Sequence, residues 1–140
     1  MTVEVFISYA HEDRRWREKL EKHLSSLKKQ QFIHAYYDGD ISPGKKIEDE
    51  TLLHLKSAQM ILLLVSSNYM AADFCYQDEL QEAIERDTAK QARVIPIFLS
   101  PVECGNAPFA ELESLPSNHK PISKWRGRED DAFFDIVQGI

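Results

Sequence analysis

The sequence has few cysteines and no long hydrophobic run, and each shortage excludes a class of protein. Its 140 residues include two cysteines, Cys75 and Cys104, without paired spacing, so no disulfide framework is indicated. No apolar stretch approaches the roughly 20 residues that span a bilayer. The amino-terminal residues also lack the apolar core of a signal peptide. These patterns predict a soluble cytoplasmic domain with reduced thiols and no membrane partner.

An excess of positive charge is missing as well. The chain has 17 Lys and Arg against 23 Asp and Glu, a formal net charge of -6. Because nucleic-acid surfaces depend on clustered Lys and Arg, we expect no nucleic-acid partner. The five histidines show no metal-ligand spacing, so we expect no metal site. The motifs GxGxxG, GxxxxGK[ST] and GxSxG are absent, which argues against a dinucleotide or phosphate cradle and against a nucleophile elbow.

Strand patterns alternate with helix patterns along the chain, which predicts an α/β fold with a parallel sheet. The expected strands cover residues 3–7, 32–37, 60–65, 93–99 and, as a short fifth strand, Lys120 to Ser123. The expected helices cover residues 12–29, 47–57, 74–87 and about 131–140. The run "MILLLV" lacks alternation, as is typical of a strand covered on both faces. Pro96 removes one ladder donor and predicts a bulge or a strand end.

The length suits one compact domain spanning residues 1–140. The last helical pattern stops at Ile140 without a capping residue or a polar tail. We therefore expect a module cut from a longer chain, with its last helix truncated near Ile140.

Three segments follow predicted strands and converge at one edge of the sheet: residues 8–12, 38–44 and 66–79. Ligands bind at this edge in parallel sheets, outside the carboxyl ends of the strands. Asp78 and Glu79 stand on the first turns of a helix there. A helix dipole alone favours such carboxylates by about 1 kcal/mol or less. The pattern leaves two interpretations open, a solvated helix start or an active-site acid.

Other residues at this edge also have two interpretations each. Ser8 can cap the following helix or contact a ligand. Asp38 and Asp40 can stabilise the turn around Pro43-Gly44 or reach ligand hydroxyls. The aromatic ring of Phe74 can pack in the core or form a stacking wall for a flat ligand.

Four segments, in this order, resemble the conserved boxes of TIR (Toll/interleukin-1 receptor) domains, in the style of bacterial members. "VFISYAHED" resembles the first box, and "LLLVSSNYMAADFCYQDEL" resembles the segment from the third strand into the third helix. "KWRGREDDAFFDI" is similar to the weaker third box. "DGDISPGKKIEDE" resembles the BB loop, formed here by Asp38, Gly39, Asp40, Ile41, Ser42, Pro43 and Gly44. The resemblance implies a flavodoxin-like fold, three α/β/α layers around a five-stranded parallel sheet.

The TIR family has two functional classes, and both remain open for this chain. Some members are non-catalytic scaffolds that act by TIR-TIR assembly. Others cleave the N-glycosidic bond of NAD+, which is then a substrate and not a bound cofactor, giving nicotinamide and ADP-ribose or a cyclic isomer. In the enzymes a required glutamate follows a cysteine in the third helix. The bacterial-type spacing from Cys75 implies Glu79, and the plant-type spacing would imply Asp78. We expect Glu79, in an enzyme of bacterial defence signalling.

The same resemblance implies the residues that line the substrate pocket: Phe6, Ser8, Tyr9, Asp40, Phe74 and Cys75. For Phe6, packing in the core is the alternative. Phe74-Cys75 stands where many relatives have a tryptophan beside the cysteine. Both classes imply self-association with other TIR domains, and in many of the enzymes a neighbouring subunit completes the pocket.

Overall fold

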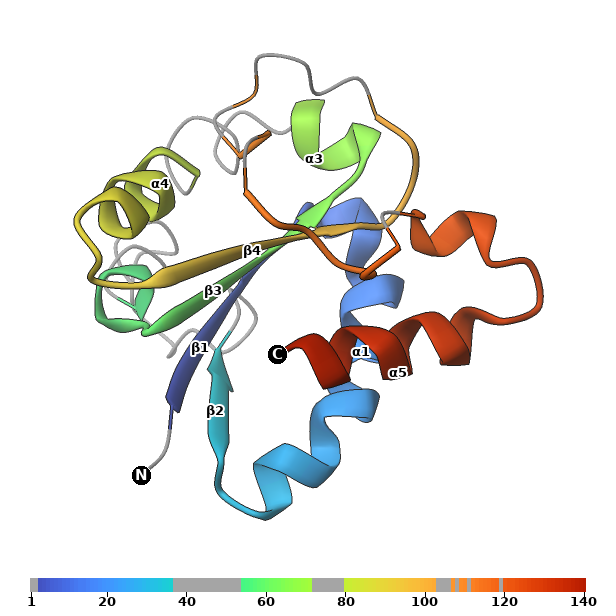
Figure 1. Ribbon diagram of the computed structural model, residues 1–140, viewed down its shortest axis with the longest axis horizontal. Coiled ribbons are helices and arrows are strands. Elements are labelled where there is room, and N and C mark those ends of the chain that lie inside the picture. Colours follow the sequence, from blue (N-terminus) through green and yellow to red (C-terminus); the bar gives the residue numbers. More distant parts are fainter. Residues whose placement is uncertain are drawn as a thin grey trace.

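The structure, a computed structural model, describes residues 3–36, 54–71, 80–102, 107, 109–110, 112–118 and 120–140. Its first half contains β1 (Val3–Ser8), the 3-10 helix η1 (His11–Asp13), α1 (Arg14–Lys29), β2 (Ile33–Tyr36), β3 (Met60–Val65) and α3 (Ser67–Ala71). The second half contains α4 (Leu80–Thr88), β4 (Arg93–Phe98), the 3-10 helix η4 (Ile122–Lys124) and α5 (Glu129–Gly139). Residues 54–57 are also helical. Figure 1 shows the strands side by side, with helices around them.

The described strands form one parallel sheet in the order β2-β1-β3-β4. This confirms the predicted α/β fold with a parallel sheet. The predicted strand over residues 60–65 is confirmed with its bounds. The first helical pattern divides into η1 and α1, and the last helix begins at Glu129, two residues before the expected start.

Side chains on both faces of the sheet are buried in two apolar clusters. On one face, α1 and α5 lie beside each other and cover alternate strand residues, among them Val5, Ile7, Leu62, Leu64, Ile95 and Ile97. On the other face, Leu55 and α4 cover the intervening residues, among them Phe6, Ile61, Leu63, Val65 and Val94. Because β3 is buried on both sides, its sequence has no polar alternation. Full burial of each leucine contributes about 1.5–3 kcal/mol.

The outer edge of β4 has no free backbone donor along its pairing positions. The Val94 N–H donates to Asp87 Oδ1 at 3.2 Å, and the Phe98 N–H donates to the Leu115 carbonyl at 3.0 Å. The Pro96 carbonyl accepts from the Leu115 N–H at 2.9 Å, so Pro96 directs its backbone groups away from β3. Its missing N–H therefore costs no bond between β3 and β4. The predicted bulge or strand end at Pro96 is wrong, since β4 continues to Phe98 in regular register.

The predicted fifth strand at Lys120 to Ser123 is also wrong. Pro121 offers no N–H to a ladder, and the chain forms η4 from Ile122, with the Ser123 N–H donating to the Leu99 carbonyl at 2.9 Å. Ile122 is buried beneath this turn in the cluster of α1 and α5. Within the described residues, the position outside β4 is taken by a single parallel bridge between Ile97 and Leu115.

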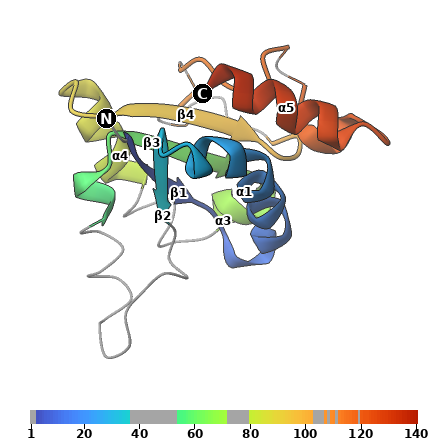
Figure 2. The ribbon, with the colours of Figure 1, turned by 90° about the horizontal axis from the view of Figure 1, so that it is seen from below.

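The helices α5 and α3 lie at different places around the sheet (Figure 2). Figure 2 shows α5 along one side of the sheet and α3 near the end of β3. Among the described residues, no helix is long and apolar enough to cross a membrane.

Candidate functional site

A buried hydroxyl pair joins the carboxyl end of β1 to α3. The Oγ atom of Ser8, the last residue of β1, lies 2.9 Å from the Tyr69 hydroxyl oxygen, and either group can donate this hydrogen bond. Ser8 is 1% exposed and Tyr69 is fully buried. The pair therefore belongs to the buried layer beneath the carboxyl ends of the strands. The N-cap residue of η1 is Ala10 and that of α1 is Asp13, so Ser8 is not the N-cap of either helix.

A second polar group lies next to it, around the carboxylate of Asp13. The Ser66 hydroxyl donates to Asp13 Oδ2 in a short hydrogen bond. Asn68 Nδ2 donates to Asp13 Oδ1 at 3.0 Å. The Ser66 Oγ atom also accepts from the Tyr69 backbone N–H at 3.1 Å, as a serine does when it caps a helix. Asp13, Ser66, Asn68, Tyr69 and Ser8 are called the edge network below.

Tyr9 follows Ser8 and lies beneath a buried arginine. The Tyr9 side chain is 4% exposed, and the Arg17 guanidinium carbon lies 5.4 Å from its ring centroid. Arg17 Nη1 donates to Glu21 Oε1 at 2.7 Å, one helical turn further along α1. This arrangement fixes the Tyr9 ring between the strand end and α1 by a cation–π contact.

The structure brings together only some of the predicted site residues. Ser8 and Tyr9 lie at the same sheet edge, and Phe6 is 1% exposed in the apolar cluster beneath it. The predicted residues Asp40, Phe74, Cys75 and Glu79 lie outside the described residues, as do Asp78 and the whole BB loop, residues 38–44. Leu80, directly after Glu79 in the sequence, is fully buried and is the first residue of α4.

A cavity opens at the carboxyl ends of β3 and β4. It has a volume of about 410 Å³ and is lined by Ser67, Met70, Ala71, Pro101 and Val102. Three of its lining residues, Ser67, Met70 and Ala71, come from α3, whose Tyr69 belongs to the edge network. The lining is apolar except for Ser67, as is common in sites for small organic ligands.

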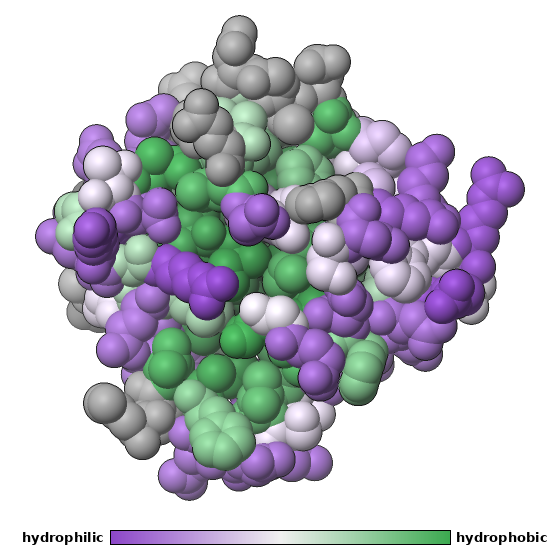
Figure 3. All heavy atoms as spheres, viewed as in Figure 1, coloured by the Kyte–Doolittle hydropathy of each residue, from purple (hydrophilic) through white to green (hydrophobic). Residues whose placement is uncertain are grey.

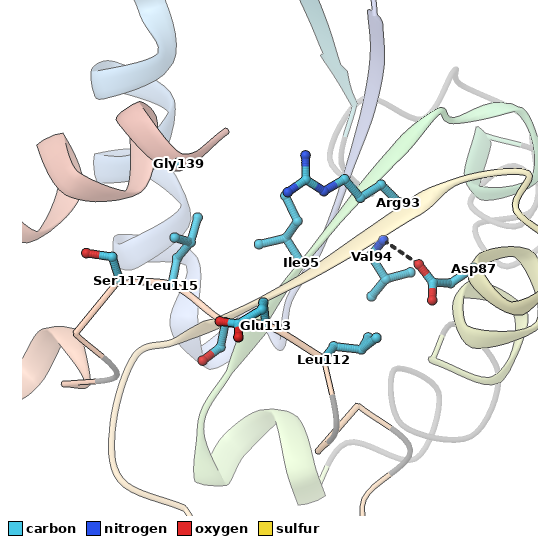
Figure 4. Close-up of a pocket in the computed structure, with 10 residues that line it drawn as sticks. Asp87, Arg93, Val94, Ile95, Leu112, Glu113, Leu115, Ser117 and Gly139 are labelled. Carbon is cyan, nitrogen blue, oxygen red and sulfur yellow. Dashed lines mark hydrogen bonds between the residues drawn. The ribbon is translucent and has the colours of Figure 1, made fainter.

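Two further cavities lie elsewhere. One, of about 310 Å³, follows the amino-terminal half of β4 at its outer edge, where Figure 4 shows Arg93, Glu113 and Asp87 around an apolar floor. The other, of about 460 Å³, is lined mostly by apolar residues, including Val3, Phe32, Ile33, Met60 and Ile140. Val3, Ile33 and Met60 are the first residues of β1, β2 and β3, so this cavity lies at the sheet edge opposite the predicted site.

The sequence patterns did not single out Asp13, Asn68 or Tyr69. Ser66 offered the clearest local signal, because a serine directly after a buried strand is a preferred helix N-cap, and it predicts the short helix α3 that was missed. Nothing local distinguishes Asp13 from its exposed neighbour Glu12. Among the described residues, no group of three His, Cys, Asp or Glu side chains is placed to hold a metal ion.

Comparisons with known proteins agree with this architecture. A family model described as TIR domain matches residues 5–137. The protein y4lF of Sinorhizobium fredii is 40% identical over 136 residues, which cover 97% of this chain and 42% of that protein. The chain thus spans less than half the length of this relative.

Two solved structures share the fold at low sequence identity. The TIR domain of the Toll-related receptor TRR-2 from Hydra magnipapillata superposes with a TM-score of 0.64 at 19% identity, over 96% of this chain and 97% of that one. The TIR domains of the activated Roq1 resistosome, which directly recognises the pathogen effector XopQ, give a TM-score of 0.59 at 19% identity, over 97% of this chain and 84% of that one. With the family model covering nearly all of the sequence, the chain belongs to the TIR domain family.

Proposed function

We propose that this TIR domain is an NAD+ nucleosidase, with Glu79 as its catalytic residue. The observation that carries the proposal is the position of Glu79 in a chain of this family, four residues after Cys75 and directly before the first described residue of α4. Leu80 is fully buried, which supports a register in which the preceding acid is the one at the site. The cavity beside α3, at the sheet edge that carries Ser8 and Tyr9, supports ligand binding there.

In the proposed reaction, the bond between the ribose C1′ atom and the nicotinamide nitrogen breaks, and its electron pair leaves with nicotinamide. The leaving group becomes neutral, so no acid is needed to protonate it. The positive charge that develops on the ribose is stabilised by the Glu79 carboxylate. Water then adds to C1′ and releases one proton, which gives ADP-ribose. Attack by the adenine of the same molecule instead gives a cyclic isomer.

The remaining predicted residues complete the proposed pocket. In the proposal, Phe74, Cys75 and Asp40 of the BB loop line the substrate pocket. Phe6 is buried in the apolar cluster that also contains Tyr69, the hydrogen-bond partner of Ser8, and the proposal places it beneath the pocket. NAD+ is the substrate, and the proposal includes no cofactor, nucleic acid or membrane partner.

The proposal includes the setting of the domain. We place it in the bacterial cytoplasm, in defence signalling, as a single TIR domain of a longer protein that becomes active by homotypic association. The complete fold would be the flavodoxin-like three-layer arrangement with a fifth strand. The bridge between Ile97 and Leu115 supports a fifth strand next to β4 in place of the one expected at Lys120 to Ser123.

A scaffold that acts only by TIR-TIR assembly is the second candidate function. It is favoured by the likeness to TIR domains of an assembled complex, the Roq1 resistosome. Such a protein would need no Glu79 carboxylate, and substitution of Glu79 would leave its assembly unchanged.

The experiment that separates the two candidates follows nicotinamide release from NAD+ by chromatography, on protein clustered on beads. Glu79→Ala should abolish the release, and Asp78→Ala, its matched neighbour, should retain it. Loss in Asp78→Ala alone would show that the plant-type register applies. Absence of release from clustered wild-type protein would rule out the enzyme and favour the scaffold.

A further inference from the structure

The edge network contains the only buried acid of the described residues. Asp13 is 4% exposed, and the other buried polar side chains of the described part of the chain are serines and arginines. A buried carboxylate is costly unless hydrogen bonds satisfy it. Asp13 meets this condition with donors from the far side of the sheet edge, Ser66 and Asn68, which are 53 and 55 residues away in the sequence.

The two donors belong to the start of α3. Ser66 directly precedes α3, and Asn68 is its second residue. The Ser66 hydroxyl donates its one proton to Asp13 and accepts from the Tyr69 N–H, so the direction of this hydroxyl is determined on both sides. The carboxylate therefore holds the first turn of α3 against the end of η1.

Asp13 joins two segments, the one that follows β1 and the helix α3, and both also lead to the proposed site. Asp13 ends η1, which follows Ser8 and Tyr9 in the sequence. On the other side, α3 supplies Met70 and Ala71 to the cavity at the sheet edge, and residues 72–79 continue the sequence from α3 to Glu79. The hydrogen bond between Ser8 and Tyr69 closes the same connection at a second point, 2.9 Å across.

We infer that Asp13 is a positioning residue: its carboxylate sets the placement of the loop after β1 relative to α3, and thereby the geometry of the catalytic edge. This inference rests on the proposed NAD+ cleavage. It deepens that function, because Asp13 does not contact the substrate and acts through Ser66, Asn68 and Tyr69. A displacement of reacting groups by about 1 Å lowers a rate up to a hundredfold.

The test compares Asp13→Asn with Asp135→Asn in clustered protein. Asp135, on α5, is a matched control, because its carboxylate also accepts from two neutral donors. These are the Ser117 N–H at 2.6 Å and the Ser117 hydroxyl at 2.7 Å. Both variants are assayed well below their melting temperatures. We expect Asp13→Asn to lower kcat about ten- to a hundredfold with KM little changed, and Asp135→Asn to retain the wild-type kcat.

Hydrogen exchange provides a readout that needs no activity. In Asp13→Asn, the amides of residues 9–13 and 66–71 should exchange faster together, and in Asp135→Asn neither segment should change. Equal kcat values in the two variants, or a rise in KM alone, would overturn the inference while leaving the enzyme intact. Absence of nicotinamide release from the wild-type protein would instead overturn the proposed function. Independently of activity, faster exchange in only one of the two segments of Asp13→Asn would overturn the inferred coupling between them.

Discussion

At the scale of single residues, Ser66 has two structural roles in one hydroxyl group. As a donor it satisfies the buried carboxylate of Asp13, and as an acceptor it caps α3 through the Tyr69 N–H. Its neighbour Ser67 has the same chemistry but is exposed. The contrast between the two serines separates the effect of hydrogen bonding from that of helix propensity.

Ser66→Ala should lower the free energy of unfolding by about 2 kcal/mol, since it removes a cap and one donor of a buried carboxylate. Ser67→Ala should change it by less than about 0.5 kcal/mol, as expected for an exposed position. Urea unfolding of the two variants beside the wild type measures the difference. Equal stability of both variants would mean that the Ser66 hydroxyl contributes no net stabilisation.

At the scale of elements, β4 is an edge strand whose donors are covered within the chain. Exposed edges with free N–H groups promote pairing with other chains. Here the Asp87 side chain, drawn with its hydrogen bond in Figure 4, accepts from the Val94 N–H. Pro96 has no N–H, and Leu115 pairs with the Phe98 N–H. Asp87 thereby joins the end of α4 to the start of β4 and protects the edge.

Asp87→Ala should lower the free energy of unfolding by about 1 kcal/mol, the contribution of one hydrogen bond, and should increase aggregation on storage. Asp87→Asn keeps an acceptor oxygen and should behave closer to wild type in both respects. Thermal melts and light scattering at matched concentrations measure the two effects. If the alanine and asparagine variants aggregated equally, the negative charge would matter and the Val94 hydrogen bond would not.

At the scale of the whole molecule, one face carries a concentration of apolar surface (Figure 3). Figure 3 shows hydrophobic side chains gathered in the middle of the face that carries the end of α5, with hydrophilic side chains around them. Two large hydrophobic residues of the described chain, Phe32 and Phe134, are 53% and 63% exposed. Apolar surface of this kind is available for contacts between proteins, in line with the homotypic association that we propose.

If association completes the pocket, nicotinamide release per domain should rise with protein concentration in solution. A monomeric enzyme would show a constant specific activity over the same range. The measurement is a dilution series at fixed NAD+ concentration, with the size of the particles followed by light scattering. Glu79→Ala serves as the control, because it should form the same particles without activity. A flat dilution curve for an active wild type would contradict activation by association.

Much of the architecture could be predicted from local patterns. The unbroken apolar run of β3 predicts its bounds and its burial on both faces, and the spacing of Leu20 and Leu24 predicts the buried side of α1. The fifth strand at Lys120 to Ser123 could not be assessed locally, because a short segment with one buried side chain, Ile122, pairs or turns according to its neighbours. The effect of Pro96 on the strand likewise depends on which side of β4 its missing N–H would face.

The sequence by itself determined the α/β class, the family and the acid proposed for catalysis, because periodicity and motif order are properties of neighbouring residues. Only the tertiary structure decided the role of Asp13, since its partners Ser66 and Asn68 are distant in the chain and meet it where parallel strands end together. It also placed Ser8 against Tyr69. Hydrogen bonds between distant segments arise from the packing of the whole chain, and no local pattern encodes them.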